Sequence, residues 1–441
     1  MTNILIVGAG PCAFVAAKTC RELGHDVSVL NPQVNKWSSV KPLDLTRKLI
    51  LKSRYQKELF LAPDLVTRFI TRKVDVYENF IFGGLSELWG GVFLPPLSRE
   101  SLGQSFSEEE VSDAIQFIEN IIEIENKDSS IYSAYRNKVK INHYISGQPP
   151  IARSRKNINN KWSAADNFKE IKLEGIHFID AILHKINVRK NGFLEVSYVN
   201  DQKQEITESF EHVFLGTGVF GTARIILNNR PDIESIEIKD SKVSYGLGLS
   251  MPKLRYSNQT LEMKPELIKV YPDKVEGIER FVQIYRLSDE LIKSIKYVKL
   301  QSIINLINKL SLGCLRLVMT FHPSTESKSI VVSKVNDGLQ AKQKNEEIRT
   351  KFGLRNYLRI MRHNNLLPIT PEFKFNPGSG VHSGAYIFNY TNGISENAIH
   401  GLANWPGVYI LGSASMKKIP TGPIMFEAMV NSRIIVKRAF A

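Results

Sequence analysis

The order of apolar and polar positions at the start of the chain predicts a strand, a helix and a second strand. Residues 4–7 are consecutive isoleucine, leucine and valine residues, which is typical of a strand buried on both faces. A helical pattern follows over 13–23 and ends at Gly24, and a second apolar run occupies 27–30. Two such strands joined by a helix predict a parallel pair.

The turn between the first strand and the helix has the pattern G-x-G-x-x-A. Gly8 allows a tight turn, Gly10 lets the backbone approach a pyrophosphate, and Ala13 stands where a third glycine often keeps helix and strand close. The helix start, which includes Pro11 and Cys12, offers N–H groups and a partial positive charge to phosphates. This unit therefore predicts a dinucleotide site.

The residue that follows the second strand would meet a ribose in such a unit. Asp or Glu usually stands there, but this chain has Asn31 followed by Pro32. An asparagine can accept a hydrogen bond through its amide oxygen, although it brings no charge. The alternative is that these two residues only form a turn.

Later patterns predict more elements of both kinds. A capping box at 107–110 opens a helix that runs past Ile122, whereas 126–160 is polar and is interpreted as a surface excursion. Residues 175–199 read as strands around an Asn-Gly hairpin turn at 191–192. A strand over 212–215, a Gly-Thr-Gly turn and a helix over 220–227 then predict a second strand–glycine–helix unit, which returns the chain to the nucleotide sheet.

The region 236–379 has a different pattern of elements. It carries strand patterns at 280–285, 314–321 and 329–335, and a helical pattern with interspersed lysines at 288–312. We interpret that helix as having a buried face with solvated lysines, and an interfacial membrane helix is the alternative.

Two further clusters of small residues stand out. In 83–91, two Gly-Gly pairs bracket a Trp, which suits a loop whose backbone closely approaches a flat or phosphorylated group, with an ordinary turn as the alternative. Residues 407–415 read as a strand that ends in small residues. A Pro-Thr-Gly-Pro turn at 420–423 and a closing helix at 424–439 follow.

The composition narrows the class of protein. A chain of 441 residues can bury a large core and is expected to form two domains. No uninterrupted apolar run of about 18 residues predicts a membrane span. Three cysteines without metal spacing leave one unpaired, so we expect no metal site and a cytoplasmic location.

The net charge of the chain indicates which binding partners it would suit. The chain has 58 basic and 44 acidic side chains, a net charge of +14. An acidic membrane surface or a phosphorylated or nucleotide-linked substrate would fit this charge, and diffuse solvated lysines are the alternative. No nucleic-acid motif is present. Peripheral contact with the inner face of a membrane would involve 288–312, and the sequence does not determine the oligomeric state.

Taken together, these clusters resemble the FAD-dependent glucose–methanol–choline (GMC) oxidoreductase family. The likeness rests on four stretches in the family's order: GAGPCAF at 8–14, GGLSELWGG at 83–91, the segment 212–229 and the C-terminal segment 407–439. Residues 236–379 contain no matching motif.

The resemblance implies an α/β fold with a discontinuous Rossmann-like FAD-binding domain and a second domain, built of a β-sheet plus helices, for the substrate. The first would comprise 1–100, 165–235 and 380–441, and the second 101–164 and 236–379. The residues that would then contact FAD are Gly8, Gly10, Pro11, Cys12, Ala13, Asn31, Gly84, Ser86, Gly90, Leu183, Gly216, Thr217, Gly218, Gly412, Ser413, Ser415 and Thr421.

The resemblance also implies a chemistry. In the family a basic side chain takes the proton of an alcohol while carbon passes hydride to the flavin. The family's histidine corresponds to His382, although the chain reads H-S-G where the family has H-x-x-G-T. The second His or Asn of the family falls at Pro423, which has no N–H and no polar side chain. Either the general-base pair is incomplete, or a residue of the unmatched region, such as His322 beside Pro323, replaces the missing member.

The expected function is oxidation of a hydroxyl group on a small polar substrate, with a sugar or sugar nucleotide suggested by the basic charge. One alternative is a flavoprotein with redox-neutral chemistry, such as a sugar isomerase or mutase. The other is a non-catalytic protein that keeps the nucleotide fold as a scaffold, because Asn31 and Pro423 depart from the family pattern.

Overall fold

The computed structural model describes most of the chain. The described residues are 2–32, 69–72, 74, 76, 80–87, 89–96, 102, 106–138, 144–171, 175–189, 192–240, 243–250, 265–273, 277–286, 314–336, 338–345, 354–370, 373–374, 385–388, 405–416 and 418–441. The predicted helix at 288–312 and the candidate His382 lie outside them. Among the helices described, none is long and apolar enough to cross a membrane. Nor do the described side chains form a group that could hold a metal ion.

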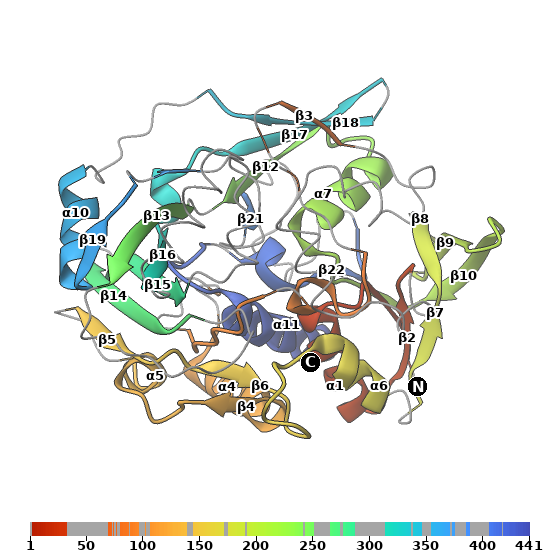
Figure 1. Ribbon diagram of the computed structural model, residues 1–441. Coiled ribbons are helices and arrows are strands. Elements are labelled where there is room, and N and C mark those ends of the chain that lie inside the picture. Colours follow the sequence, from red (N-terminus) through yellow and green to blue (C-terminus); the bar gives the residue numbers. More distant parts are fainter. Residues whose placement is uncertain are drawn as a thin grey trace.

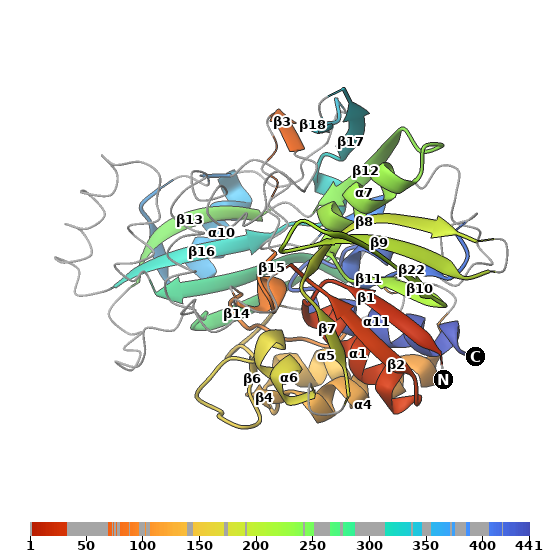
Figure 2. The same ribbon diagram turned by 90° about the vertical axis from the view of Figure 1, so that its right-hand side faces the viewer.

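A five-stranded parallel sheet forms the first half of the molecule, and segments far apart in the sequence meet in it (Figure 2). Each neighbouring pair of strands in it runs parallel. This confirms the strands predicted near both termini and after residue 211. In spatial order the strands are β22 (Val408–Ile410), β11 (His212–Leu215), β1 (Asn3–Val7), β2 (Asp26–Leu30) and β7 (His177–Ile179).

Strand β1 is buried on both faces, as its apolar run predicts. Ile4 and Ile6 pack in a core with α1 (Pro11–Glu22), α4 (Glu108–Ile121), α6 (Ala164–Ile171) and α11 (Met425–Ala439). Leu5 and Val7 pack in a second core with α7 (Gly218–Asn229). Helices therefore cover both sides of the parallel sheet, which is the arrangement of an α/β fold.

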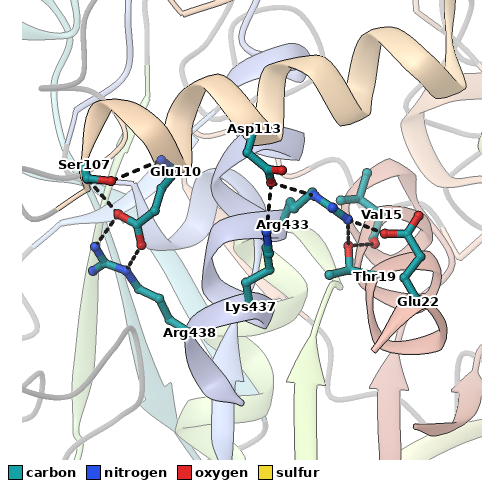
Figure 3. Close-up of polar contacts among 9 residues, drawn as sticks. All are labelled: Val15, Thr19, Glu22, Ser107, Glu110, Asp113, Arg433, Lys437 and Arg438. Carbon is teal, nitrogen blue, oxygen red and sulfur yellow. Dashed lines mark hydrogen bonds and ion pairs between the residues drawn. The ribbon is translucent and has the colours of Figure 1, made fainter. Parts of the chain in front are cut away.

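Helix α11 is tied to α1 and α4 by charged side chains (Figure 3). The Arg433 guanidinium lies between Glu22 of α1, at 2.8 Å, and Asp113 of α4, at 3.5 Å. Arg438 donates two hydrogen bonds to Glu110, which is also part of the predicted capping box at the start of α4. The C-terminal helix is thus fixed against the first helix of the chain.

The strands at 175–199 divide between two sheets. Strand β7 joins the parallel sheet, and β8 (Ala181–Val188), β9 (Leu194–Asn200) and β10 (Glu205–Phe210) form an antiparallel sheet. Gly192 has a φ of +85°, and its N–H donates to the Arg189 carbonyl. The hairpin turn is confirmed at Gly192, and Asn191 lies outside the described residues.

A seven-stranded, largely antiparallel sheet dominates the second half (Figure 1). One face of it, with Phe281 and Phe321, belongs to the core that contains α1, and α10 (Leu354–His363) packs on the other face. The strands predicted at 280–285 and 314–321 are confirmed. The sheet consists of β19 (Leu366–Pro368), β13 (Val243–Ser250), β16 (Leu315–Phe321), β15 (Gly277–Arg286), β14 (Leu267–Asp273), β5 (Ile145–Gly147) and β20 (Phe373–Lys374).

A five-stranded sheet connects regions that the predicted domain boundaries separate. Its β17 confirms the strand expected at 329–335, and its β3 pairs with β18 although residues 69–72 were assigned to the other domain. The boundaries themselves stay a prediction. The strands in spatial order are β21 (Ala385–Phe388), β12 (Ser235–Asp240), β17 (Ile330–Val335), β18 (Gly338–Gln343) and β3 (Phe69–Arg72).

The interpretation of 126–160 as a surface excursion is wrong. This segment contains α5 (Ser130–Arg136), β5 and β6 (Ile151–Arg153), the last of which pairs with β4 (Glu123–Glu125). Ile131 and Tyr132 of α5 are buried in the main core. The helix has only seven residues, so its apolar face gives too short a period to recognise from sequence.

Candidate functional site

The two strand–glycine–helix units lock together where β1 and β11 end. Gly8 has a φ of +101°, and a Cβ atom at this residue would lie 2.7 Å from the Gly216 carbonyl oxygen. A Cβ on Gly216 would in turn lie 2.9 Å from the Ala13 Cβ. Glycine is therefore required at both turns, because any side chain would separate α1 from the second unit.

The Gly-Gly pair at 83–84 docks onto the same place. The Gly83 N–H donates to the Ala9 carbonyl at 3.0 Å, and both glycines have positive φ, +99° and +60°. A Cβ on Gly84 would lie 3.0 Å from the Gly10 Cα. The loop thus closely approaches the first glycine turn, and its approach to a flat or phosphorylated group stays a prediction.

The C-terminal segment supplies a third contact, through η5 (Gly412–Ser415). Gly412 has a φ of +71°, and a Cβ there would lie 2.8 Å from the Cys12 Sγ. The Asn431 side-chain amide donates to the Gly412 carbonyl and to the Ser415 hydroxyl, at 3.0 and 2.8 Å. The Gly412 N–H donates to the Ser432 hydroxyl. Two buried polar residues of α11 thus hold this turn against the start of α1.

Asn431 and Ser432 were missed by the sequence analysis. Their signal was the presence of three polar residues, Asn431, Ser432 and Arg433, in the apolar centre of the closing helix, between Val430 and Ile434. Asn431 and Ser432 are fully buried, and a buried polar side chain must find hydrogen-bond partners. The chain provides those partners in the turn beside Cys12.

The starts of α1 and α7 face open space. Among the described residues, no side chain caps the first turn of either helix, and each helix is preceded or begun by glycine, at Gly10 and Gly218. A Cβ added to either glycine would have no heavy atom of the described part of the chain within 4 Å. By contrast, serines cap α4 and α5. Two uncapped helix starts side by side are suited to bind an anion.

The thiol of Cys12 lies within this arrangement. Burial raises its pKa to about 11, against a smaller lowering by the hydrogen bond with Ser432. The thiol is therefore uncharged at neutral pH, so it does not repel an anion bound at the start of α1.

Asn31 does more than form a turn. It is buried, its backbone N–H donates to the Ile179 carbonyl at 3.0 Å, and its side-chain N–H donates to the Phe80 carbonyl at 3.3 Å. Its side-chain amide oxygen is then the atom that can accept a hydrogen bond from a ligand. Leu183, the other predicted position, lies in β8. Strand β8 follows β7 directly in the chain, and β7 pairs with β2, which Asn31 follows, so the two positions lie on neighbouring segments.

Ser86 is engaged within its own loop, η2 (Gly84–Glu87). Its hydroxyl donates to the Gly83 carbonyl at 2.6 Å and accepts from the Ala164 N–H at 3.0 Å. Burial raises the pKa of the neighbouring Glu87, although hydrogen bonds with Ser163 and Ser86 oppose the shift. These contacts anchor the loop to α6.

The rest of the loop is held by aromatic and charged side chains. The Trp89 indole N–H donates to the Trp162 carbonyl at 3.3 Å, and the Lys161 ammonium donates to the Trp89 carbonyl at 2.8 Å. Gly90 is half-buried directly after Trp89. The contact of Ser86 and Gly90 with a cofactor stays a prediction.

The Pro-Thr-Gly-Pro turn meets the large antiparallel sheet. Gly422 has a φ of +142°, and a Cβ there would lie 3.2 Å from the Phe281 ring. Thr421 and Ser413 are half-buried. On the facing unit, the hydroxyls of Thr217 and Thr222 are 3.1 Å apart. The ends of β11 and β22 lie at the same edge of the parallel sheet, because the two strands pair in parallel, and the turn at 420–423 contacts β15 of the antiparallel sheet.

His322 is enclosed in a polar cluster that we define as Ser244, His322, Glu326 and Arg280. The His322 Nε2 is 2.7 Å from the Ser244 hydroxyl, and its Nδ1 is 3.5 Å from Glu326. Arg280 donates to the other Glu326 oxygen at 2.8 Å. Burial alone would raise the Glu326 pKa, but the His322 hydrogen bond and the Arg280 charge lower it to about 2.

The geometry of this cluster is that of a group of side chains that supports the fold. All its members are buried, and Ser244 alternates along β13 with Val243 and Tyr245, which pack in the core shared with α1. Both ring nitrogens of His322 face groups of the cluster. The geometry does not favour His322 as a replacement for the second catalytic residue, and His382 lies outside the described residues.

Comparisons with known proteins reveal the fold. No protein-family model and no curated protein matches the sequence. Among solved structures, pyridoxine 4-oxidase from Mesorbium loti is similar with a TM-score of 0.61 at 11% identity, covering 99% of both chains. A formate oxidase from Aspergillus oryzae RIB40, studied for FAD modification, has a TM-score of 0.62 at 10% identity over 99% of this chain and 98% of that one. The chain therefore has the α/β fold of these oxidases, which confirms the fold implied by the resemblance to the GMC family.

Proposed function

We propose that the chain is an FAD-dependent oxidoreductase that oxidises a hydroxyl group of a small polar substrate. One observation carries the proposal: glycine turns from four distant segments meet around the uncapped start of α1 and leave open space in front of Gly10. This cradle stands in a chain that shares its fold, over almost its whole length, with an oxidase whose FAD has been studied.

The residues present fit a dinucleotide. The N–H groups of Cys12 and Ala13 at the start of α1 would hold a pyrophosphate, and the Gly218 end of α7 adds a second set of N–H groups. Gly10 lacks the side chain that would fill this space. The amide oxygen of Asn31 would accept from a ribose hydroxyl, and the backbone near Leu183 would adjoin the adenine.

The flavin end would lie toward the C-terminal segment. Gly84, Ser86 and Gly90 would adjoin the ring on one side and Ser413, Ser415 and Thr421 on the other, with Gly216, Thr217 and Gly412 forming the floor. FAD bound there would supply a two-electron acceptor for hydride from carbon. His382 would take the hydroxyl proton, and since Pro423 carries no base, it would do so without the family's second residue.

The substrate is proposed as a small polar molecule, with a sugar or sugar nucleotide as the finer proposal. The net charge of +14 suits a phosphorylated substrate. The similar structures are named as oxidases of small molecules, pyridoxine and formate. The three cysteines are free in the structure, which suits a reducing compartment such as the cytoplasm.

A visible spectrum of the purified protein tests the cofactor. We expect flavin bands at about 370 and about 450 nm. A colourless protein that takes up no FAD on reconstitution would support the non-catalytic scaffold instead.

Anaerobic mixing with alcohols and sugar nucleotides tests the reaction. An oxidoreductase bleaches the flavin while the substrate is oxidised, whereas a redox-neutral flavoprotein turns over its substrate without net oxidation. The variant His382→Ala should keep FAD and lose flavin reduction. Full reduction in this variant would overturn the assignment of His382 and leave the cofactor proposal intact.

A further inference from the structure

Helix α10 and the strand after it expose apolar side chains at the edge of the large sheet. Leu354 and Leu358 of α10 are 67% and 42% exposed, and Leu367 and Ile369 in and after β19 are 59% and 37% exposed. Figure 1 shows α10 and β19 together at one end of the molecule. Four large apolar side chains exposed within sixteen residues are unusual, because exposed ones are normally scattered singly.

The element is firmly seated, so its outer face is a defined surface. The inner side of α10 is buried on β13, where a Cβ on Gly246 would collide with the Tyr357 hydroxyl. The Tyr357 hydroxyl also donates to the Thr370 carbonyl at 2.8 Å, which closes the segment on itself. Met361 packs beside Gly248 in the same way, with its sulfur 3.4 Å from where a Cβ would lie.

Positive charge accompanies these apolar residues. The segment 354–370 contains Arg355, Arg359 and Arg362 and no Asp or Glu. Within the described part of the chain, Arg355 and Arg362 form no ion pair, and both are exposed. Leu354, Leu358 and Arg362 follow one another at a spacing of four residues, so they lie along one side of the helix. By contrast, the arginines of α11 are paired with acids of α1 and α4.

We propose that this surface, formed by Leu354, Arg355, Leu358, Arg362, Leu367 and Ile369, docks on an anionic phospholipid bilayer. The leucines would enter the interfacial layer while the arginines contact lipid phosphates. A second copy of the chain fits less well, because two surfaces with arginines and no acid would repel each other. The inference goes beyond the proposed function and does not depend on whether the chain binds FAD.

Vesicle co-sedimentation of the full chain tests the proposal. Wild type should bind vesicles of phosphatidylglycerol in phosphatidylcholine, bind pure phosphatidylcholine far less, and lose binding as salt rises. Each arginine near an anionic surface contributes about fivefold to the binding constant. The double variant Arg355→Ser with Arg362→Ser should therefore bind about thirtyfold more weakly, and Leu354→Glu with Leu358→Glu should lose binding as well.

The matched control is Leu23→Glu, because Leu23 is also 42% exposed but lies at the end of α1. It should bind like wild type. The proposal is overturned if wild type does not bind anionic vesicles, if it binds neutral vesicles equally well, or if the two double variants bind like wild type. A change of oligomeric state in the leucine variant, with no vesicle binding by wild type, would instead identify a self-association surface. Thermal unfolding shows which variants are folded, and the two double variants test the surface independently.

Discussion

The start of α1 and the polar cluster around His322 differ in where their polar groups find partners. In the cluster, the polar side chains face one another within the chain: Ser244 faces His322, His322 faces Glu326, and Glu326 accepts from Arg280. At the start of α1, Gly10 at the N-cap has no side chain to cap the helix, and no described residue fills the space in front of it. Buried polar groups need partners. The cluster around His322 draws its partners from the chain, whereas the open start of α1 calls for a ligand.

The difference separates residues that support the fold from residues that bind. A histidine in a conspicuous sequence position, His322 beside Pro323, belongs to the first kind, because its contacts are all internal. Gly10, where an added Cβ would meet open space, belongs to the second. Mutations in the two regions should therefore affect different measurements, stability in one and flavin content in the other.

The largest expected effect on stability comes from Arg280→Met. Removing the guanidinium leaves the Glu326 carboxylate buried with His322 alone, and breaking a buried ion pair in this way costs about 3–5 kcal/mol. Denaturant unfolding measures the loss. Arg286→Met is the control, since Arg286 is exposed at the end of the same strand, and it should cost less than about 1 kcal/mol. Equal losses in the two variants would show that the cluster is not a special source of stability.

An intermediate effect is expected for Asn431→Ala, which should lower both the stability of the protein and its affinity for FAD. The substitution removes the donors to the Gly412 carbonyl and the Ser415 hydroxyl, at a cost of about 1–3 kcal/mol. Because the turn at 412–415 then loses its support, FAD affinity should fall as well. Titration of the flavin-free variant with FAD, followed by flavin fluorescence, measures this. Unchanged affinity would mean that the turn does not contact the cofactor.

A smaller effect concerns stability in acid. The Glu326 pKa is lowered to about 2 from an ordinary 4.5, so the ionised form stabilises the folded state above pH 4.5. That contribution is lost as the pH falls from 4.5 toward 2, because the unfolded chain then binds the proton first. Glu326→Gln should flatten this part of the stability profile. A profile as steep as that of wild type would assign the acid sensitivity to other carboxylates.

Much of the region around the start of α1 could be predicted from the sequence because its signals are local. The apolar run at 4–7, the glycines after it and the capping box at 107–110 each specify a backbone geometry within a few residues. The glycine contacts between Gly8 and Gly216, or Gly84 and Gly10, join segments that only the folded chain brings together. Sequence could place each turn but not their meeting.

The polar cluster around His322 and the short helices resisted prediction, because they lack such local signals. The pairing of Arg280 with Glu326 spans 46 residues, and α5 and α10 are too short for a clear helical period. Gly246 and Gly248 look like weak points of a strand, yet they make room for Tyr357 and Met361 of α10. The role of His382 still rests on the family resemblance.

The most direct test of the account is the flavin content of Gly10→Ala. Gly10 has an ordinary φ of −81°, and its Cβ would meet no atom of the described residues within 4 Å. The FAD-free variant should therefore be as stable as FAD-free wild type. The new methyl group would enter the proposed pyrophosphate space, and the purified variant should therefore lose its absorbance at about 450 nm. Gly24→Ala is the control: its φ of +83° makes it destabilising by about 1–2 kcal/mol, but it should keep its flavin. A Gly10→Ala protein that retains wild-type flavin content would contradict the account.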